Sequence, residues 1–428
     1  MRFVLPKRAP VILLSLLSTT AAFLFASPAS AGITLYDKDN WKFDTDGRAQ
    51  GFLSYGFGDA KPNGGSGTAM LQDYGFGAVG NGDDPPKFST TRIRSGWAAD
   101  VFGVNATHKY SDTLSVTGRL SFWFYIENDQ AKPGSGNQGL DIRQGFFKVE
   151  STNWGGLLIG RNLGLHPRQD IIQNAIFSDA DGIGSPCGIT GATITCGQAG
   201  YGVMFPTFAP GIVYNTPDFS GFNLSVGIYD PVRLNQPNAG TAPGPTVYGQ
   251  TPLPRVESEA TYHWGDKISV DLFASGMWQR LVKTGDSTAL DAVGYGGGFR
   301  VGVYGLKLGL LGGQNKGGGM YIPLGDAMID STGELRTTSH YWAQASYTFG
   351  NVTATGGIGA SINKQTAADE AAANMFSLIK TLRGINFGVR YSMGPVTWIA
   401  QFFQMHHEWF NGAKQDGNVV NIGGSYNW

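Results

Sequence analysis

Side chains of the types that carry out catalysis or bind metals occur at a few places in this 428-residue chain. Residues 406–408 are His-His-Glu, but adjacent strand residues point to opposite faces, so the two imidazoles do not readily share one ion. The Ser-His pair at 339–340 has no context of a catalytic triad, and the sequence contains no G-x-S-x-G motif. Glycine runs at 296–298 and 317–319 lack the Lys and Ser/Thr of a phosphate-binding loop. We therefore expect no enzyme, no metal site and no bound cofactor.

These residues belong to segments in which apolar and polar side chains alternate. In residues 114–127 the even positions, such as Leu114 and Phe122, are apolar, and the odd ones, such as Arg119, are mostly polar. A period of two predicts β-strands with one apolar face and one wet face. Several such segments reach 10 to 14 residues. That length suits a tilted strand that crosses a bilayer, whereas soluble strands have about five or six residues.

The connections between these segments are of two kinds. Seven are tight turns and eight are longer, polar and Gly-rich, so fifteen connections join sixteen strands. An even number of strands with short turns at one end and long loops at the other is typical of an outer-membrane barrel. The turns are expected near 111–112, 152–155, 217–221, 265–267, 304–305, 350–351 and 393–395. Aromatic residues flank nearly every one of these turns, as in a membrane-interface girdle.

The N-terminus predicts export. Three basic residues, an apolar run at 11–25 and Ala-Ser-Ala at 29–31 are typical of a signal peptide, which we expect to be cleaved before Gly32. After Ala31 no continuous apolar run approaches 18 residues, so the mature chain, 32–428, can cross a bilayer only as a closed barrel. We interpret it as one domain. Its balance of 28 Lys and Arg against 32 Asp and Glu gives no support for a nucleic-acid partner.

Two segments resemble Gram-negative general porins. Residues 141–162 read DIRQGFFKVESTNWGGLLIGRN, and residues 212–230 read IVYNTPDFSGFNLSVGIYD, with Thr216 where Ser is usual in that family. The chain also ends on Trp428, whereas the aromatic residue at that end is most often Phe. The resemblance implies an antiparallel barrel of sixteen strands, commonly trimeric, whose third loop folds inward and narrows the lumen. The loop 162–210 is the longest and falls at that position, with a short helix expected at 170–177.

Charged residues define a candidate pore constriction. Alternation places five arginines on the lumen face of successive strands, and the inserted loop can present three acids opposite them. Opposed charges make a transverse field that orients water and ions and disfavours bulky apolar solutes. Asp170 has an alternative role as a helix cap. The arginines are Arg48, Arg92, Arg94, Arg119 and Arg143, and the acids are Asp170, Asp179 and Asp181.

Three further residues carry separate expectations. Arg161 shares the outward face with Leu157 and Ile159, where exposing a charge to lipid costs free energy. The resemblance suggests a subunit interface there. Cys187 and Cys196, the two cysteines, lie in the third loop, and export favours a disulfide over a metal pair or free thiols.

The function that these features predict is passive diffusion of ions and small hydrophilic solutes through an outer-membrane channel. A channel selective for sugars or anions is the first alternative. Stacked lumen aromatics would favour sugars, and a basic ladder without facing acids would favour anions. A structural or adhesive barrel with a plugged lumen is the second alternative. The expected partners are outer-membrane lipid, small solutes and two further copies of the chain.

Overall fold

The computed structural model describes residues 32–59, 87–96, 100–124, 126, 141–172, 185–187, 194–235, 246–285, 288–324, 328–330, 332–371 and 378–428. The predicted signal peptide, 1–31, lies outside the described residues. Its cleavage and the mature boundary at 32–428 therefore stay predictions.

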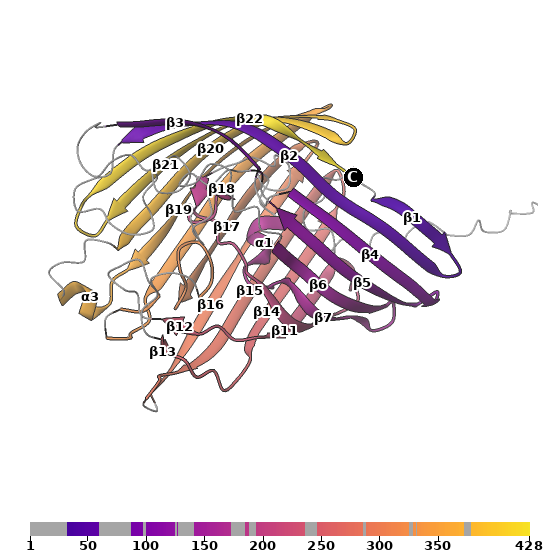
Figure 1. Ribbon diagram of the computed structural model, residues 1–428, viewed down its shortest axis with the longest axis horizontal. Coiled ribbons are helices and arrows are strands. Elements are labelled where there is room, and N and C mark those ends of the chain that lie inside the picture. Colours follow the sequence, from indigo (N-terminus) through magenta and orange to yellow (C-terminus); the bar gives the residue numbers. More distant parts are fainter. Residues whose placement is uncertain are drawn as a thin grey trace, which may run out of the picture.

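Sixteen antiparallel strands form a closed barrel (Figure 1). The sheet contains 18 strands in all, of which β1 and β3 only pair along parts of β2. The barrel strands are β2 (Trp41–Asp59), β4 (Asp100–Ser111), β5 (Leu114–Phe124), β6 (Asp141–Ser151), β7 (Gly155–Leu163), β10 (Phe208–Asn215), β11 (Phe222–Tyr229), β14 (Arg255–Gly265), β15 (Ile268–Val282), β16 (Ala289–Val303), β17 (Leu306–Lys316), β18 (Thr337–Phe349), β19 (Val352–Lys364), β20 (Ile379–Met393), β21 (Val396–Trp409) and β22 (Lys414–Asn427).

Pairing between the first and last strands closes the barrel. Arg48 of β2 lies opposite Asn427 of β22, and the register continues to Gly58 opposite Gly417. The terminal residue Trp428 extends this seam, because its backbone N–H and C=O both bond to Gly47. The backbone pairing along the seam is thus continuous from Gly47 to Gly58, as a lipid environment requires. The sixteen-stranded closed barrel predicted from turns and loops is confirmed.

A hairpin that the alternation did not predict precedes the barrel. β1 (Ile33–Lys38) pairs with the first residues of β2, on the edge that β22 leaves open. Asp39 and Asn40 make the turn at φ of 56° and 64°, which are the left-handed values of a two-residue hairpin turn. On the outward side, Trp41 and Phe43 stack at 5.8 Å between ring centroids. The hairpin therefore continues the aromatic girdle across the seam.

The second barrel strand is interrupted. β3 (Lys87–Arg94) and β4 both pair with β2, and only three residues of β2 lie between the two pairings. Asp100 helps to close the interruption, because its carboxylate accepts from Gln50 N at 2.6 Å and from Ser95 Oγ at 2.8 Å.

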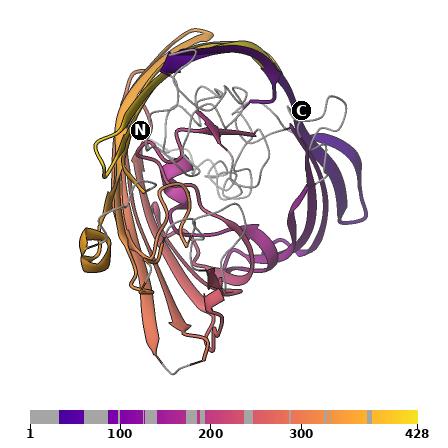
Figure 2. The ribbon, with the colours of Figure 1, turned by 60° about the vertical axis from the view of Figure 1, so that its left-hand side comes forward.

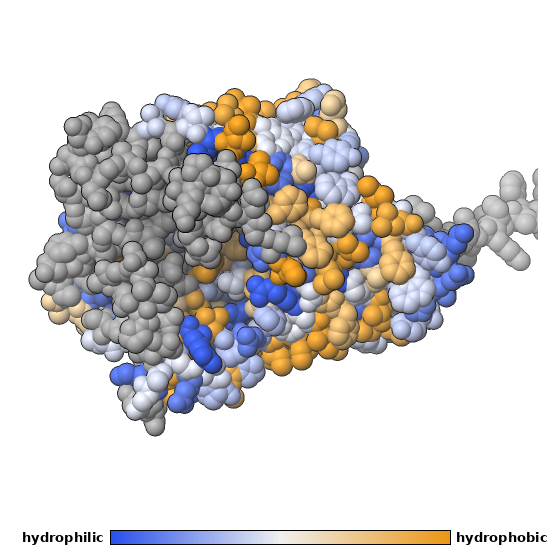
Figure 3. All heavy atoms as spheres, in the orientation of Figure 1, coloured by the Kyte–Doolittle hydropathy of each residue, from blue (hydrophilic) through white to orange (hydrophobic). Residues whose placement is uncertain are grey.

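The outer face of the barrel is apolar and exposed. Leu53 is 53% exposed, Phe387 58% and Ile422 60%, although all three are large hydrophobic residues. Figure 3 shows apolar side chains gathered over the strands of the face in view, with hydrophilic ones toward the β1–β2 turn. Such a surface is stable only against lipid or another protein.

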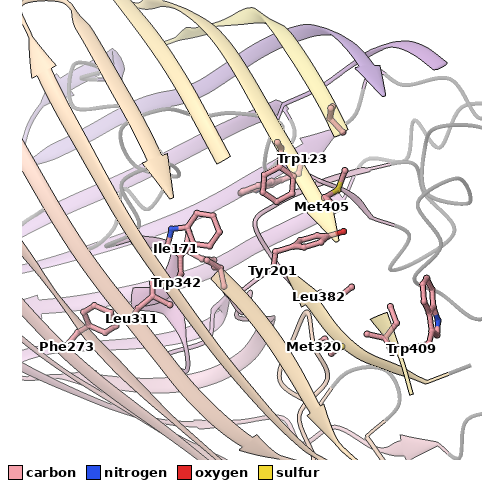
Figure 4. Close-up of a cluster of buried hydrophobic side chains, with 14 of the residues drawn as sticks. Trp123, Ile171, Tyr201, Phe273, Leu311, Met320, Trp342, Leu382, Met405 and Trp409 are labelled. Atoms are coloured by element: carbon pink, nitrogen blue, oxygen red, sulfur yellow. The ribbon is translucent and has the colours of Figure 1, made fainter. Parts of the chain in front are cut away.

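The inner face changes along the barrel axis. β21 carries Thr397 and Gln401 near its turn end but Phe403, Met405 and Trp409 near its loop end, all pointing inward. These apolar residues belong to a buried cluster with side chains from β5, β15, β17, β18, β20 and the third loop (Figure 4). The inward face of β21 is therefore mainly apolar near the loops and mainly polar near the turn.

The remaining described elements are short. They are the helices α1 (Arg168–Ile172) and α3 (Ala367–Ala371) and the strands β8 (Ser185–Cys187), β9 (Ile194–Gly197), β12 (Leu234–Asn235) and β13 (Thr246–Tyr248). In the described part of the chain, no helix is long and apolar enough to span a membrane.

Candidate pore constriction

The third loop, 162–210, enters the barrel. α1 and the β8–β9 hairpin lie inside the ring of strands in Figure 2. Two limbs of this loop are described outside that hairpin, a leading limb at 164–172 and a returning limb at 198–207. Hydrogen bonds join both limbs to the wall formed by β14–β21, and Leu165 also packs with Leu158 of β7 and Val213 of β10.

Glu257 and His166 fix the start of the leading limb. A carboxylate oxygen of Glu257, on β14, accepts from the backbone N–H of Leu165 at 2.7 Å and of His166 at 3.0 Å. The imidazole of His166 reaches Ser275 Oγ and Asn315 Oδ1, both at 2.9 Å. Because an amide oxygen only accepts, Nε2 carries the proton and Nδ1 accepts from the serine. Burial lowers the pKa of His166 to about 4, which agrees with a neutral ring.

Buried ion pairs hold α1 to the same wall. Arg168 bonds to the Glu259 carboxylate through Nε and Nη2, and Arg255 lies 2.9 Å from Glu257 and over the ring of Tyr229. Burial alone would lower the pKa of Arg168, but the facing Glu259 carboxylate raises it. The four charges balance within this cluster, as buried charges must. Three of the four, Arg255, Glu257 and Glu259, lie at alternate positions of β14 and face inward, and Arg168 comes from α1.

The returning limb is fixed further around the barrel. The Tyr201 hydroxyl lies 2.7 Å from Nε2 of His407 on β21, and its ring packs edge-on against Phe403 at 5.2 Å. Gly202 N donates to Ser361 Oγ at 3.2 Å. Gly202 has φ of 111°, and a Cβ there would lie 2.1 Å from the carbonyl oxygen of Tyr341. Only glycine allows the loop to approach the wall this closely.

Histidines recur at these contacts. The sequence contains six, and His166, His340 and His407 each bond across the contact between loop and wall. The motifs at 339–340 and 406–408 thus each contribute an anchor for the loop. The adjacent histidines of β21 point to opposite faces. His407 faces inward, and His406 bonds to Asp416 on the outer side. Among the described residues, no cluster of His, Cys, Asp or Glu could hold a metal ion.

The predicted arginines occupy the opposite part of the barrel. Registers place Arg48, Arg92 and Arg94 on the inward side of β2 and β3, where Arg48 is 2% and Arg94 0% exposed. Arg119 of β5 also points inward, but its guanidinium is bound to both oxygens of Asp46 and to Asn105. We call Arg48, Arg92, Arg94, Arg119 and Arg143 the arginine wall.

Arg143 faces inward through an irregularity in β6. The pairing of β5 with β6 shifts register at Ser121 and Phe122. Arg143 bonds to Asp141 at 2.8 Å, and its guanidinium carbon lies 4.7 Å from the ring centroid of Trp123. A cation over an aromatic face is held in place by the ring quadrupole. Phe208, at 5.8 Å, contributes a second ring.

The predicted acids are not gathered opposite the arginines in the described residues. Asp170 is 1% exposed, and its carboxylate bonds to His340 of β18. It therefore departs from both expectations, because it neither faces the arginine wall nor caps α1, which begins two residues earlier. Asp179 and Asp181 lie outside the described residues.

The other predicted site residues are placed in part. Arg161 is exposed on the outer face of β7, opposite Gly145 and Pro210. Cys187 and Cys196 lie in the paired strands β8 and β9, with Cys187 opposite Ile194. The side chains of both cysteines are outside the described part, so the disulfide stays a prediction.

A closed sixteen-stranded barrel with an apolar outer face and a charged lumen defines an outer-membrane channel. The chain belongs to the Gram-negative porin family, whose profile matches residues 18–428. It is an outer-membrane porin for passive diffusion. A search of curated protein sequences finds no match.

Solved structures share this fold at low sequence identity. The outer membrane channel DcaP of Acinetobacter baumannii is 15% identical, with a TM-score of 0.65 over 93% of this chain and 100% of that one. The anion-selective porin from Comamonas acidovorans is 14% identical, with a TM-score of 0.57 over 91% of this chain and 100% of that one. Salmonella typhi OmpF, in complex with daunomycin, is 12% identical, with a TM-score of 0.54 over 92% and 100%.

Proposed function

We propose that this porin passes ions and small hydrophilic solutes through a constriction between the arginine wall and the third loop. One observation carries this proposal: the described limbs of the loop bond to β14–β21, whereas the five arginines project from β2, β3, β5 and β6. The described limbs thus lie against one side of the lumen, and the arginines project from the other. Solutes that pass between them experience the electric field of the fixed charges on the wall.

The charges of the arginine wall set the selectivity in this proposal. Opposed acids, for which Asp179 and Asp181 remain the candidates, would complete a transverse field across the lumen. Small ions and water reorient in such a field, and bulky apolar solutes lose favourable hydration.

A preference for anions is the second candidate. In the described limbs of the loop, Asp170 is the one acid, and it is bonded to His340 on the far wall. If no acid of the loop faces the arginine wall, its positive charge attracts anions into the narrowest section. The sign of the selectivity therefore depends on Asp179 and Asp181. Replacing both by Asn should shift the preference further toward anions if they face the arginines, and should leave it unchanged if they do not.

Single-channel recording in planar bilayers tests whether the lumen conducts. A conducting porin gives stepwise currents proportional to voltage, and swelling of porin-containing liposomes in neutral sugars measures the size limit. An absence of conductance would instead favour a barrel with a plugged lumen.

Transport is the only activity that we assign to the chain. The serine at 339 lies on the outer side, where its hydroxyl accepts from Gln314, and the adjacent His340 points inward to Asp170. A nucleophile and its base must lie within hydrogen-bonding reach of each other. Hydrolysis of chromogenic ester or peptide substrates by the purified protein would contradict this assignment.

We assign a homotrimer with Arg161 at or near the subunit interface. Apolar residues surround Arg161 on the outer face, among them Leu120 at 52% and Ile142 at 51% exposure. Exposing a guanidinium to lipid among these apolar side chains costs free energy. Substitution of Arg161 by Ala should lower the temperature at which the trimer dissociates on gels. An unchanged temperature would count against the interface role.

A further inference from the structure

A cation and three aromatic rings meet in the lumen at Arg143. The guanidinium carbon of Arg143 lies 4.7 Å from the ring centroid of Trp123 and 5.8 Å from that of Phe208. The rings of Trp123 and Phe208 pack edge to face at 5.6 Å, and the ring of Phe205 lies 6.3 Å from that of Phe208. We propose that these four residues, the arginine–aromatic site, bind solutes in which a carboxylate is joined directly to an aromatic ring, as in benzoate.

The site combines the two sides of the proposed constriction. Trp123 lies on β5 and Arg143 on β6, in the arginine wall, whereas Phe205 belongs to the returning limb of the third loop and Phe208 begins β10. The backbone N–H of Phe205 donates to the carbonyl oxygen of Tyr321 at 2.8 Å, which holds this part of the limb in place. The inference therefore rests on the proposed function and names a solute class for the same constriction.

Trp123 is the buried floor of the site. It is 1% exposed, and its Nε1 donates to Ser121 Oγ at 3.0 Å. Ser121 in turn donates to Gln144 Oε1 at 3.0 Å, so side chains of the wall itself hold the indole. Figure 4 shows Trp123 among the residues of the buried apolar cluster. An indole fixed in this way presents an ordered ring face to the guanidinium.

The other three side chains of the site are accessible in part. Phe205 and Phe208 are only partly buried, and they pack against the edge of the buried apolar cluster. Arg143 is partly buried as well, whereas three other members of the arginine wall, Arg48, Arg94 and Arg119, are buried. A solute that reaches the guanidinium of Arg143 therefore also meets aromatic surface.

The guanidinium of Arg143 can bind the carboxylate of a solute. Its Nε donates to Asp141 at 2.8 Å, and the side chain of Asp141 is 48% exposed. Water screens an exposed ion pair, so an incoming carboxylate can compete with Asp141 for the guanidinium. Carboxylates bind the planar guanidinium fork through two parallel hydrogen bonds. The ring face of Trp123 holds the guanidinium in position for this exchange.

The aromatic surface beside the cation adds a preference among carboxylates. When the carboxylate of benzoate bonds to Arg143, its ring comes within reach of Phe208 and Phe205, because aromatic pairs interact at about 4.5 to 7 Å between centroids. The ring of the solute leaves water and gains edge-to-face or stacked contacts. Acetate offers only a charge to this site, and benzyl alcohol only a ring. Benzoate should therefore bind more tightly than either.

Block of the potassium chloride current by these three solutes tests the proposal in planar bilayers. In the wild-type porin we expect benzoate to halve the current at about one fifth of the concentration that acetate or benzyl alcohol requires. Phe208→Ala should remove the advantage of benzoate over acetate, and Arg143→Gln its advantage over benzyl alcohol. Phe146→Ala is the matched control, since this partly buried phenylalanine of β6 packs against a different cluster. Phe208→Leu, which keeps the apolar volume, replaces Phe208→Ala if that variant fails to assemble.

Saturation-transfer NMR of benzoate with the detergent-solubilised full-length porin measures binding without conductance. A porin that conducts but binds benzoate no better than acetate would overturn this proposal and leave the proposed function standing. A barrel that does not conduct but loses benzoate binding in Phe208→Ala would do the opposite. An unchanged advantage of benzoate in the folded Phe208→Ala variant, or an equal loss in Phe146→Ala, would also overturn the proposal.

Discussion

Nε2 of His340 lies 2.9 Å from a carboxylate oxygen of Asp170, and neither side chain is more than 2% exposed. The two residues are 170 positions apart and join β18 to the helix of the third loop. A buried acceptor without its donor loses about 1 to 3 kcal/mol, so this bond specifies where the helix rests. The acid that the sequence placed opposite the arginines instead holds the loop to the other wall.

Replacing Asp170 by Ala should loosen the leading limb of the loop. The substitution leaves His340 without its acceptor and should cost about 2 kcal/mol of docking. We expect faster hydrogen exchange in residues 164–172 and more frequent closures in single-channel records. Glu370→Ala, at an exposed acid of the equally short helix α3, is the control. Exchange at the wild-type rate in Asp170→Ala would show that the bond does not hold the loop.

Acid should weaken the same contact through His166. Burial lowers the pKa of this ring from an ordinary 6.5 to about 4, so the docked loop holds it neutral. As the pH falls from about 6.5 to 4, His166 binds a proton when the loop is released but stays neutral when the loop is docked. The free energy of docking therefore weakens by up to about 3 kcal/mol. Above pH 6.5 the ring is neutral in both states, and stability does not change.

Closure frequency between pH 7.5 and 4 measures this effect. The wild type should close more often as the pH falls, and His166→Gln, which cannot take up the proton, should respond less. The side chains of Glu257, Asp170 and His340 lie near His166 and are unchanged in this variant. An identical pH profile in both proteins would contradict the role of His166.

Gly202 should tolerate no side chain. Gly202→Ala places a Cβ against the Tyr341 carbonyl in a left-handed backbone conformation, so the returning limb must move away from β18. We expect a loss of about 2 kcal/mol or more, seen as a lower unfolding temperature and an altered conductance. Gly118→Ala is the matched control, because a Cβ there meets no atom within 4 Å. Equal unfolding temperatures for both variants would exclude the close approach.

Cys187 and Cys196 should be oxidised in the exported protein. The unfolded chain should take up maleimide only after reduction, and replacing both cysteines by Ser should cost about 2 to 3 kcal/mol in the loop-entropy account. Labelling of both thiols without a reductant would refute the disulfide.

Local periodicity explains what the sequence predicted well. Alternation fixes inward and outward faces strand by strand, so the barrel and the inward parity of Arg48, Arg94 and Arg119 followed from it. The hairpin of β1 was missed, since a six-residue strand gives a weak signal beside the predicted signal peptide. The position of Asp170 was also missed, because its partner His340 is remote in sequence and parity says nothing of which wall a loop contacts. Two sequence features could have indicated where the third loop contacts the wall: the histidines at inward positions, and the acids at alternate positions of β14.

The reversal potential in a salt gradient tests the central claim most directly, because it reports the charge that permeating ions meet at the narrowest section. The wild type is compared with Arg94→Gln/Arg143→Gln, and with Lys38→Gln/Lys267→Gln as a control of equal charge change outside the lumen. If the arginine wall lines the constriction, the double arginine variant shifts the reversal potential toward cation preference and the control does not. Unchanged ion preference in the arginine variant would contradict the account.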